Sequence, residues 1–260
     1  MNLNTSWAGR LLSLSLPGLV LLGLLVIWEA GTVVSGIEKW ILPAPSLIAE
    51  SLWEQRALLT EHTMRTLLET ALGLTAAVML SVVIATFLDV SEWLRKAVYP
   101  ILVVSQTVPI IAIAPLFMIW FGYGILPKVI IVALVCFFPI TINLAEGYRY
   151  TDKDMIRLME TMGAGRMQIF RMVKLPAALP YFFSGLRIAG TYSVMGAVIG
   201  EWLGANKGLG IYLTRASQSY LTERVFAAIF VIVVLSLVIF GIIELLGRLM
   251  MPWHQSKQQS

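Results

Sequence analysis

Long apolar runs separated by short polar segments make up most of this chain. Six runs reach the length of a membrane span, at about residues 12–34, 64–88, 98–121, 127–147, 179–200 and 225–247. A spanning helix needs about 20 apolar residues, whereas the strands of a membrane barrel alternate apolar and polar residues. The pattern therefore predicts an all-α membrane protein with six transmembrane helices. We expect a single domain over residues 1–260, with its core at about residues 60–247.

A basic polar segment at residues 148–176 interrupts the apolar runs. Within it, residues 154–162 and 166–173 each carry apolar positions at helical spacing, which is typical of amphipathic helices. Gly163 and Gly165 lie between the two stretches and permit a tight bend. We expect two short helices at an angle to each other, outside the bilayer, where a soluble partner can bind them. An ordinary basic loop is the alternative.

Two prolines indicate where this segment meets the next span. Pro176 follows Leu175, and this pair is expected to end the second short helix, because proline disrupts a helix interior. Pro180 is then expected in the first turn of the fifth span, where a missing N–H costs nothing.

Four polar residues at the apolar runs are candidates for a translocation path. They are Gln106 in the third run, Asn143 and Glu146 in the fourth, and Glu201 at the outer end of the fifth. Polar groups inside spans usually face a cavity or a neighbouring helix. A packing kink at Gln106 and Pro109, a helix–helix hydrogen bond from Asn143, and an interfacial carboxylate at Glu201 remain open alternatives.

The distribution of basic residues predicts the orientation. Charged residues are only 13% of the chain, about half the share in a soluble domain. With the N-terminus inside, eleven basic residues fall in inner segments and seven in outer ones. The inner set is Arg10, Arg95, Lys96, Arg149, Lys153, Arg157, Arg166, Arg171, Lys174, Arg248 and Lys257, and the outer set is Lys39, Arg56, Arg65, Lys128, Lys207, Arg215 and Arg224. This bias predicts a multi-pass protein of the cell membrane, inner or plasma, with both termini in the cytoplasm.

The residue types that carry catalysis or bind cofactors are scarce. Cys136 is the only cysteine, which excludes an intramolecular disulfide, and His62 and His254 are far apart in sequence, which argues against a histidine-based metal site. No phosphate-binding Gly-rich loop with Lys-Ser/Thr and no nucleophile motif occurs. Basic residues do not interleave with aromatic ones, so nucleic-acid binding is not expected. We expect no cofactor, no metal and no enzymatic activity, so the energy for any transport must come from another subunit.

The basic segment resembles a known loop. Gly163, Val173, Leu175 and Pro176 match the spacing of the "EAA…G…I-LP" loop of binding-protein-dependent ABC importer permeases. The Glu-Ala-Ala positions of that family fall on residues 157–159, which are Arg-Leu-Met, and a glutamate occurs only at position 160. The resemblance implies that residues 153–176 form cytoplasmic coupling helices that dock on the ATP-binding subunit. The residues it marks for this contact are Arg157, Glu160, Gly163, Ala164, Arg166, Arg171, Leu175 and Pro176.

Motifs elsewhere are similar to the nitrate, sulfonate and taurine branch of that family. They are the residues 42–46, 62–67, 106–109, 114–122, 138–140 and 204–210. Residues 180–187 and 193–204 look most like permeases for thiamine precursors of the hydroxymethylpyrimidine type. The resemblance implies the transmembrane fold of a type I ABC importer, two permease copies, ATP-binding subunits, and an extracellular or periplasmic solute-binding protein. Sulfonate, taurine or nitrate-type anions are the alternative substrates.

Two other classes of membrane protein would show different sequence patterns. An ion-coupled secondary transporter would be expected to show inverted repeats and paired intramembrane carboxylates. A membrane enzyme or scaffold would need a cluster of His, Asp or Glu at one membrane face. Neither pattern is evident in the sequence, which by itself does not identify the substrate.

Overall fold

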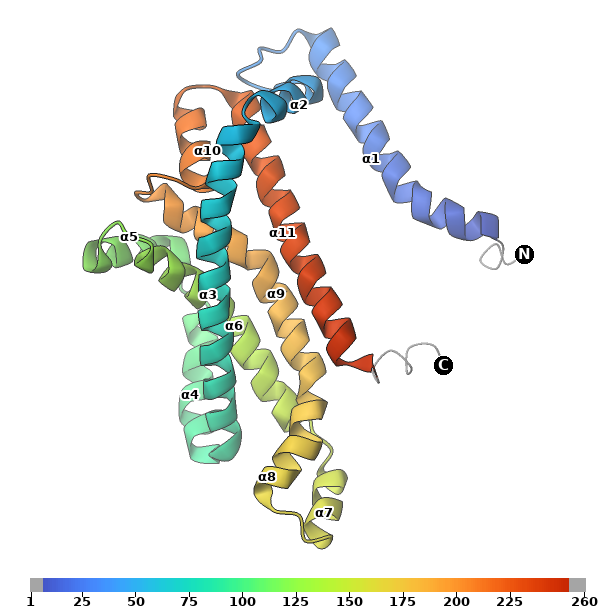
Figure 1. The fold of residues 1–260 in the computed structure, drawn as a ribbon, viewed down its shortest axis with the longest axis vertical. Helices are drawn as coiled ribbons and strands as arrows, with labels where there is room; N and C mark the ends of the chain where they lie inside the picture. The colour runs from blue at the N-terminus through green and yellow to red at the C-terminus, as the bar shows by residue number, and fades with distance from the viewer. Residues whose placement is uncertain (1–6, 253–260) are drawn as a thin grey trace. The chain divides into compact units, whose positions relative to one another are not determined.

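The structure is a computed structural model that describes residues 7–252, and those residues are helical throughout their regular parts (Figure 1). His254 and Lys257, used above, lie outside the described residues. The helices are α1 (Trp7–Ser35), α2 (Pro45–Glu54), α3 (Arg56–Val90), α4 (Glu92–Ser105), α5 (Ile110–Phe121), α6 (Leu126–Arg149), α7 (Lys153–Thr161), α8 (Arg166–Ile169), the π-helical turn η2 (Phe170–Lys174), α9 (Leu175–Trp202), α10 (Leu209–Gln218) and α11 (Thr222–Met250). The all-α membrane fold predicted from the sequence is confirmed.

Five helical stretches are long and apolar enough to cross a membrane. They are Leu16–Ser35, Arg56–Val90, Leu126–Arg149, Arg166–Trp202 and Thr222–Met250. The third predicted run, residues 98–121, is not one continuous helix, because the chain bends by 99° between α4 and α5. Pro109 explains the break: it has no N–H to continue α4, and it precedes α5 with an extended ψ of 114°. Counting this pair as one span gives the six expected.

The described residues form two compact units. The first consists of residues up to 60 together with 212–230. Within it, the end of α1 is joined to α2 by Glu29, whose carboxylate accepts hydrogen bonds from the Ser46 backbone N–H (3.0 Å) and hydroxyl (2.7 Å). The Trp28 ring also packs against Phe226 at the start of α11, with 5.6 Å between ring centroids. The single domain expected over the whole chain stays a prediction.

The second unit, residues 61–211 and 231 onward, holds the closest helix pair, α6 with α9 (Figure 1). Glycine permits this contact: a Cβ at Gly185 of α9 would lie 2.6 Å from the carbonyl oxygen of Pro139 in α6. Small residues let two backbones approach in this way in membranes, where packing drives helix association. Ile140 of α6, whose Cα would lie 3.0 Å from the same Cβ, is fully buried at this contact.

The segment before α9 differs from the expectation at two prolines. Leu175 and Pro176 do not end the second short helix, because α8, η2 and α9 form one helical stretch from Arg166 to Trp202. A π-helical turn precedes Pro176, and the Leu175 N–H bonds to the Phe170 carbonyl five residues back. This wider turn accommodates a proline ring that would clash in a regular α-helix. Pro180 accordingly lies inside α9 and not in its first turn.

Candidate functional site

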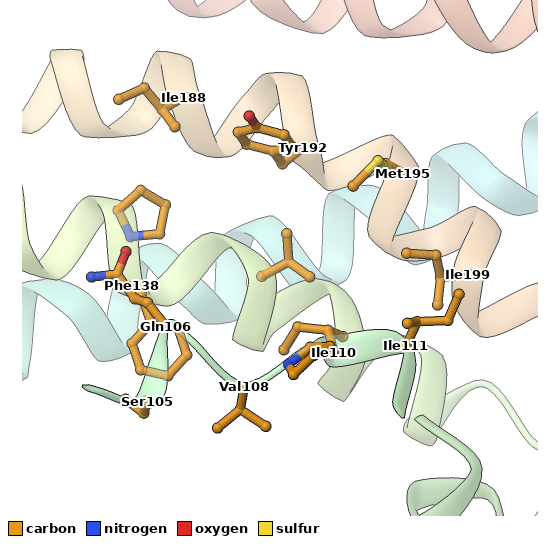
Figure 2. Close-up of a pocket in the computed structure, with 13 residues that line it drawn as sticks. Ser105, Gln106, Val108, Ile110, Ile111, Phe138, Ile188, Tyr192, Met195 and Ile199 are labelled. Atoms are coloured by element: carbon orange, nitrogen blue, oxygen red, sulfur yellow. The ribbon is translucent and has the colours of Figure 1, made fainter. Parts of the chain in front are cut away.

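A cavity of about 450 Å³ opens in the second unit where α4 breaks from α5. Its walls come from the break itself, α5, α6 and α9 (Figure 2). The lining residues are Ser105, Gln106, Val108, Pro109, Ile110, Ile111, Val135, Phe138, Pro139, Ile188, Tyr192, Met195 and Ile199. The proline break that divides the third predicted span therefore also shapes this space.

One face of α9 forms an entire wall of the cavity. Ile188, Tyr192, Met195 and Ile199 follow one another at intervals of four, three and four residues, which places them on the same side of a helix. Figure 2 shows this row across the space from Gln106 and Phe138. Sequence reasoning missed these four residues, although their helical spacing was a signal that could have identified the face.

The cavity is apolar with few polar groups. No Lys, Arg, Asp or Glu occurs among its lining residues. The Ser105 hydroxyl donates to the Leu102 carbonyl (2.9 Å) within α4. The Gln106 amide and the Tyr192 hydroxyl, in contrast, have no hydrogen-bond partner among residues 7–252, so both remain available to a bound solute.

Only one of the four predicted path residues, Gln106, lines this cavity. Asn143 donates to the Pro139 carbonyl one turn earlier (2.8 Å), a bond within α6 and not the helix–helix bond considered from the sequence. Glu146 accepts a hydrogen bond from the Tyr99 hydroxyl (3.0 Å). Both side chains are engaged in the protein's own hydrogen bonds.

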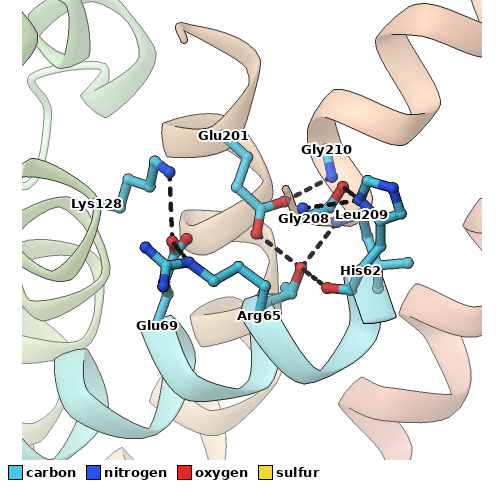
Figure 3. A network of polar contacts seen from close by, with 9 residues as sticks. His62, Arg65, Glu69, Lys128, Glu201, Gly208, Leu209 and Gly210 are labelled. Carbon is cyan, nitrogen blue, oxygen red and sulfur yellow. Dashed lines mark hydrogen bonds and ion pairs between the residues drawn. The ribbon is translucent and has the colours of Figure 1, made fainter. Parts of the chain in front are cut away.

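Glu201 belongs to a buried polar network (Figure 3). One carboxylate oxygen accepts from the Thr66 hydroxyl of α3 (2.7 Å), and the other accepts from the Gly210 N–H in the first turn of α10 (2.6 Å). The Leu209 N–H in turn donates to the Thr66 hydroxyl oxygen (2.9 Å). Glu201 is fully buried and does not line the cavity, and a role for it in the translocation path stays a prediction. The helix N-terminus supplies donors and a favourable dipole that the sequence pattern did not reveal.

Further polar contacts lie on both sides of Glu201 within the second unit (Figure 3). On one side, the Gly208 N–H donates to Nδ1 of the buried His62 (2.9 Å). On the other side, the Glu69 carboxylate pairs with Lys128 of α6 (3.3 Å) and with Arg65 (2.9 Å). Glu69 and Lys128 are both buried, so this is an ion pair inside the protein rather than on its surface. The network fixes the α9–α10 connection onto α3 and α3 onto α6.

The predicted coupling segment contains a Schellman turn, a common helix-ending motif, at Gly163. The Gly163 N–H donates to the Glu160 carbonyl and the Ala164 N–H donates to the Met159 carbonyl, each at 3.0 Å. Gly163 has a φ of +79°, which favours glycine, while a Cβ there would meet open space. Gly165 instead begins α8 with a φ of −71°. The bend predicted between the two helices is confirmed, and Gly163 carries its special conformation.

Most charged side chains of this segment are exposed and lack strong partners. Arg157 pairs only with Asp154, at 3.5 Å, and both are largely exposed. Glu160, Arg166 and Arg171 are exposed and form no ion pair within the described part of the chain. Exposed apolar side chains accompany them, namely Met155, Leu158, Met162, Met167, Met172 and Leu175. A surface that mixes free charge with flexible methionines is suited to docking a protein partner.

One residue anchors the segment and was not predicted from sequence. Lys174 in η2 donates to both carboxylate oxygens of Asp89, at 3.0 and 2.8 Å, where α3 ends. Both side chains are mostly buried, so the position of η2 against α3 is set by a short, charge-assisted contact.

The comparison with known families decides the class of this protein. Residues 72–252 match the family described as binding-protein-dependent transport system inner membrane component. The chain belongs to this family of ABC transporter permeases. The matched range includes the cavity, residues 153–176, and Lys128, Glu201 and residues 208–210 of the buried network. The family predicted from the loop motif is therefore confirmed, and the chain is a multi-pass permease subunit of an ABC transporter.

Several relatives can be aligned with this permease over nearly its whole length. It is 38% identical over 242 residues to the formylaminopyrimidine transport permease protein of Halalkalibacterium halodurans, covering 93% of this chain and 96% of that protein. It is 36% identical to the riboflavin transport system permease protein of Chloroflexus aurantiacus (94% and 91% covered). The taurine transport system permease protein of Escherichia coli is 30% identical (90% and 88% covered). The predicted likeness to thiamine-precursor permeases, within the branch that includes taurine permeases, is confirmed.

Proposed function

We propose that this permease imports a neutral, pyrimidine-type solute such as a thiamine precursor, using ATP hydrolysed by a partner subunit. The observation that carries the proposal is the cavity at the α4–α5 break, whose lining residues include no charged side chain. The likeness to a permease named for formylaminopyrimidine transport supports the same substrate class.

The chemistry of the cavity favours a neutral ring over an anion. A sulfonate or nitrate that left water here would meet no cationic side chain, and an unpaired charge is costly in an apolar environment. A flat heterocycle would instead stack against the rings of Tyr192 and Phe138. The Gln106 amide and the Tyr192 hydroxyl would bond to its ring nitrogens and amino groups. A volume of about 450 Å³ suits a solute of one or two rings.

The alternative substrate is a sulfonate, taurine or nitrate-type anion. The 30% identity to a taurine permease supports it. The apolar cavity argues against it, because such a substrate would need a cation at the site. Arg187, which precedes the lining residue Ile188, is paired with Glu244 of α11 (3.1 Å) and does not line the cavity.

The proposed mechanism links the coupling segment to the cavity through one helix. In this account two copies of the permease form the pore, with both termini in the cytoplasm. Two ATP-binding subunits grip residues 153–176, and the bound solute-binding protein delivers solute from the opposite side. The helical stretch Arg166–Trp202 carries the coupling residues at one end and Tyr192 in its interior. A displacement of α7 and α8 by the ATPase would therefore shift the α9 wall of the cavity and alternate its access.

Competition for uptake tests the substrate class. Vesicles would carry the permease with an ATP-binding subunit and a solute-binding protein from the same organism, and ATP-driven uptake of labelled hydroxymethylpyrimidine and of taurine would be measured. We expect uptake of the pyrimidine only. Tyr192→Ala should lower the uptake rate while Tyr192→Phe, which keeps the ring, should retain most of it. Uptake of taurine but not of the pyrimidine would overturn the substrate proposal and leave the family assignment intact.

An ion-coupled mechanism is tested in the same vesicles. Uptake that continues without ATP and stops when an ionophore removes the ion gradients would contradict the ATP-driven mechanism. We expect the opposite dependence, because the buried carboxylates Glu69 and Glu201 are held by hydrogen bonds and an ion pair and do not line the cavity.

A further inference from the structure

A second concavity of about 390 Å³ lies in the second unit, between α4 and the end of α6. It is lined by Glu92, Arg95, Lys96, Tyr99, Pro100 and Arg149. Unlike the apolar cavity, it gathers three basic side chains and a single carboxylate. Its chemistry therefore suits an anion and not the solute proposed above.

The positive charge of this concavity is not neutralised by the protein. Lys96 lies 4.0 Å from Glu92, but both side chains are more than 80% exposed, and such a pair contributes little. Arg95 and Arg149 form no ion pair with any residue among 7–252. Two guanidinium groups, one on α4 and one at the end of α6, thus line the concavity without an ion-pair partner in that range, and this group binds phosphate oxygens with two parallel bonds.

The aromatic residue beneath these groups is fixed in place. The Tyr99 hydroxyl donates to the Glu146 carboxylate of α6 (3.0 Å). The Arg95 guanidinium lies over the Tyr99 ring, 5.9 Å from its centroid. This contact between a cation and an aromatic face limits the positions open to Arg95 and reduces the entropy lost on binding.

An exposed apolar stripe continues from the concavity along α4. Trp93, Ala97, Ile101 and Val104 share one face of that helix at intervals of four, four and three residues, and all four are exposed. In a membrane protein, an exposed apolar helix face of this kind is suited to contact with acyl chains. Trp93 lies at the beginning of the stripe, as tryptophans do at the level of lipid headgroups. A ligand that uses both features must carry phosphate at one end and hydrocarbon at the other.

We propose that Arg95, Lys96 and Arg149 form a binding site for the headgroup of an anionic phospholipid, whose acyl chain lies along the apolar face of α4. Such a lipid would bridge α4 to α6 beside the break that shapes the transport cavity. This site is independent of the solute that the permease carries. It makes the broken span sensitive to the lipid composition of the membrane, since basic pockets between spans select anionic headgroups.

Retention of lipid by the purified full-length permease tests the site. The protein in detergent would be mixed with phosphatidylglycerol or phosphatidylcholine, and bound lipid would be counted by native mass spectrometry, together with the thermal unfolding temperature. We expect preferential retention of phosphatidylglycerol and a higher unfolding temperature with it. Each arginine should contribute about fivefold to the preference, so Arg95→Gln with Arg149→Gln should nearly abolish it.

Matched controls separate this site from general attraction to basic residues. Arg157→Gln with Arg166→Gln removes the same charge outside the concavity and should leave phosphatidylglycerol binding unchanged. If the double Gln variant fails to fold, Arg95→Lys with Arg149→Lys keeps the charge, and it should weaken binding because the bidentate contact is lost. Glycerol phosphate, which has no acyl chain, should not protect the protein from unfolding.

Three results would overturn the proposal. They are equal retention of both lipids, a folded double Gln variant that still prefers phosphatidylglycerol, and full protection by glycerol phosphate, which would indicate a site for a soluble phosphate. A double Gln variant that binds lipid normally but no longer captures the ATP-binding subunit would assign the concavity to that protein interface instead.

Discussion

The helical stretch from α8 through α9 carries charged side chains at both ends. At one end they are exposed and unpaired within residues 7–252, and at the other end they are buried and hydrogen-bonded. At the α8 end, Arg166 and Arg171 are exposed and unpaired among the described residues. At the other end, Glu201 is fully buried, and both of its oxygens accept hydrogen bonds at 2.7 Å or less. This difference indicates that the Glu201 end is part of the folded core, whereas the α8 end is available to bind another molecule.

The energetic consequences of the two ends differ as well. Exposed ion pairs contribute about 0–1 kcal/mol, so the coupling segment is not stabilised by its charges. A buried acceptor that loses its hydrogen-bond partner, such as Glu201 without Thr66, costs about 1–3 kcal/mol. The coupling segment can therefore exchange its contacts for those of a partner, whereas the Glu201 end is held to α3 and α10.

The largest expected effect is at the buried ion pair. Lys128→Met leaves Glu69 buried with only the half-exposed Arg65 beside it, and should reduce stability by about 3–5 kcal/mol. Thermal unfolding of the purified protein in detergent measures this. Glu69→Leu combined with Lys128→Met removes both charges and should recover most of the loss. A single Lys128→Met variant as stable as the wild type would show that the pair is not a structural element.

The next effect concerns the carboxylate of Glu201. Thr66→Val removes the hydroxyl that contacts Glu201 and Leu209, and leaves a buried acceptor and a buried N–H unsatisfied. We expect a loss of about 1–3 kcal/mol in unfolding free energy. Thr66→Ser keeps the hydroxyl and is the matched control. Equal unfolding temperatures for the Val and Ser variants would contradict the role of this bond.

The Schellman turn should affect coupling more than stability. Gly163→Trp forces a bulky residue into a φ of +79°, although its side chain has open space. We expect ATP-driven uptake to fall about tenfold, with protein level in the membrane and ATP hydrolysis retained. Gly165→Ala, at an ordinary φ, should keep normal uptake. Normal transport by Gly163→Trp would refute the coupling role of this turn.

The smallest effect on stability is expected from the exposed arginines. Arg157→Ala removes a pair with Asp154 at 3.5 Å between two largely exposed side chains, so unfolding free energy should change by less than about 0.5 kcal/mol. Its effect should appear only when the ATP-binding subunit is present, as weaker capture of that subunit. A clear loss of stability in the isolated permease would mean that the segment is part of the folded core.

The sequence predicted features that depend on local patterns. The apolar runs located the spans, and Gly163 with its neighbours located the bend, because helix length and glycine conformation are readable from neighbouring residues. Pro176 was misjudged because a π-helical turn accommodates it, a detail of backbone geometry that no apolar pattern reports. The 99° break at Pro109 was expected only as an interruption within one span.

Features that depend on distant residues were not predictable in the same way. Glu201 seemed interfacial because its donors, Thr66 and Gly210, come from other elements of the fold. The cavity wall on α9 was missed because Tyr192 is one aromatic residue among many until α4, α5 and α6 surround it. Asn143 and Glu146 are polar residues in a span, but each is already bonded within the protein.

Capture of the ATP-binding subunit tests the central claim most directly, since the account assigns the exposed end of this helical stretch to that partner. The permease would be co-expressed with an ABC ATP-binding subunit from the same organism, once as wild type and once with Arg157→Glu and Arg166→Glu. The account predicts that the wild type co-purifies with the subunit and that the charge-reversed variant, equally stable, loses it. A stable wild-type permease that captures no ATP-binding subunit, or a variant that captures it equally well, would contradict the account.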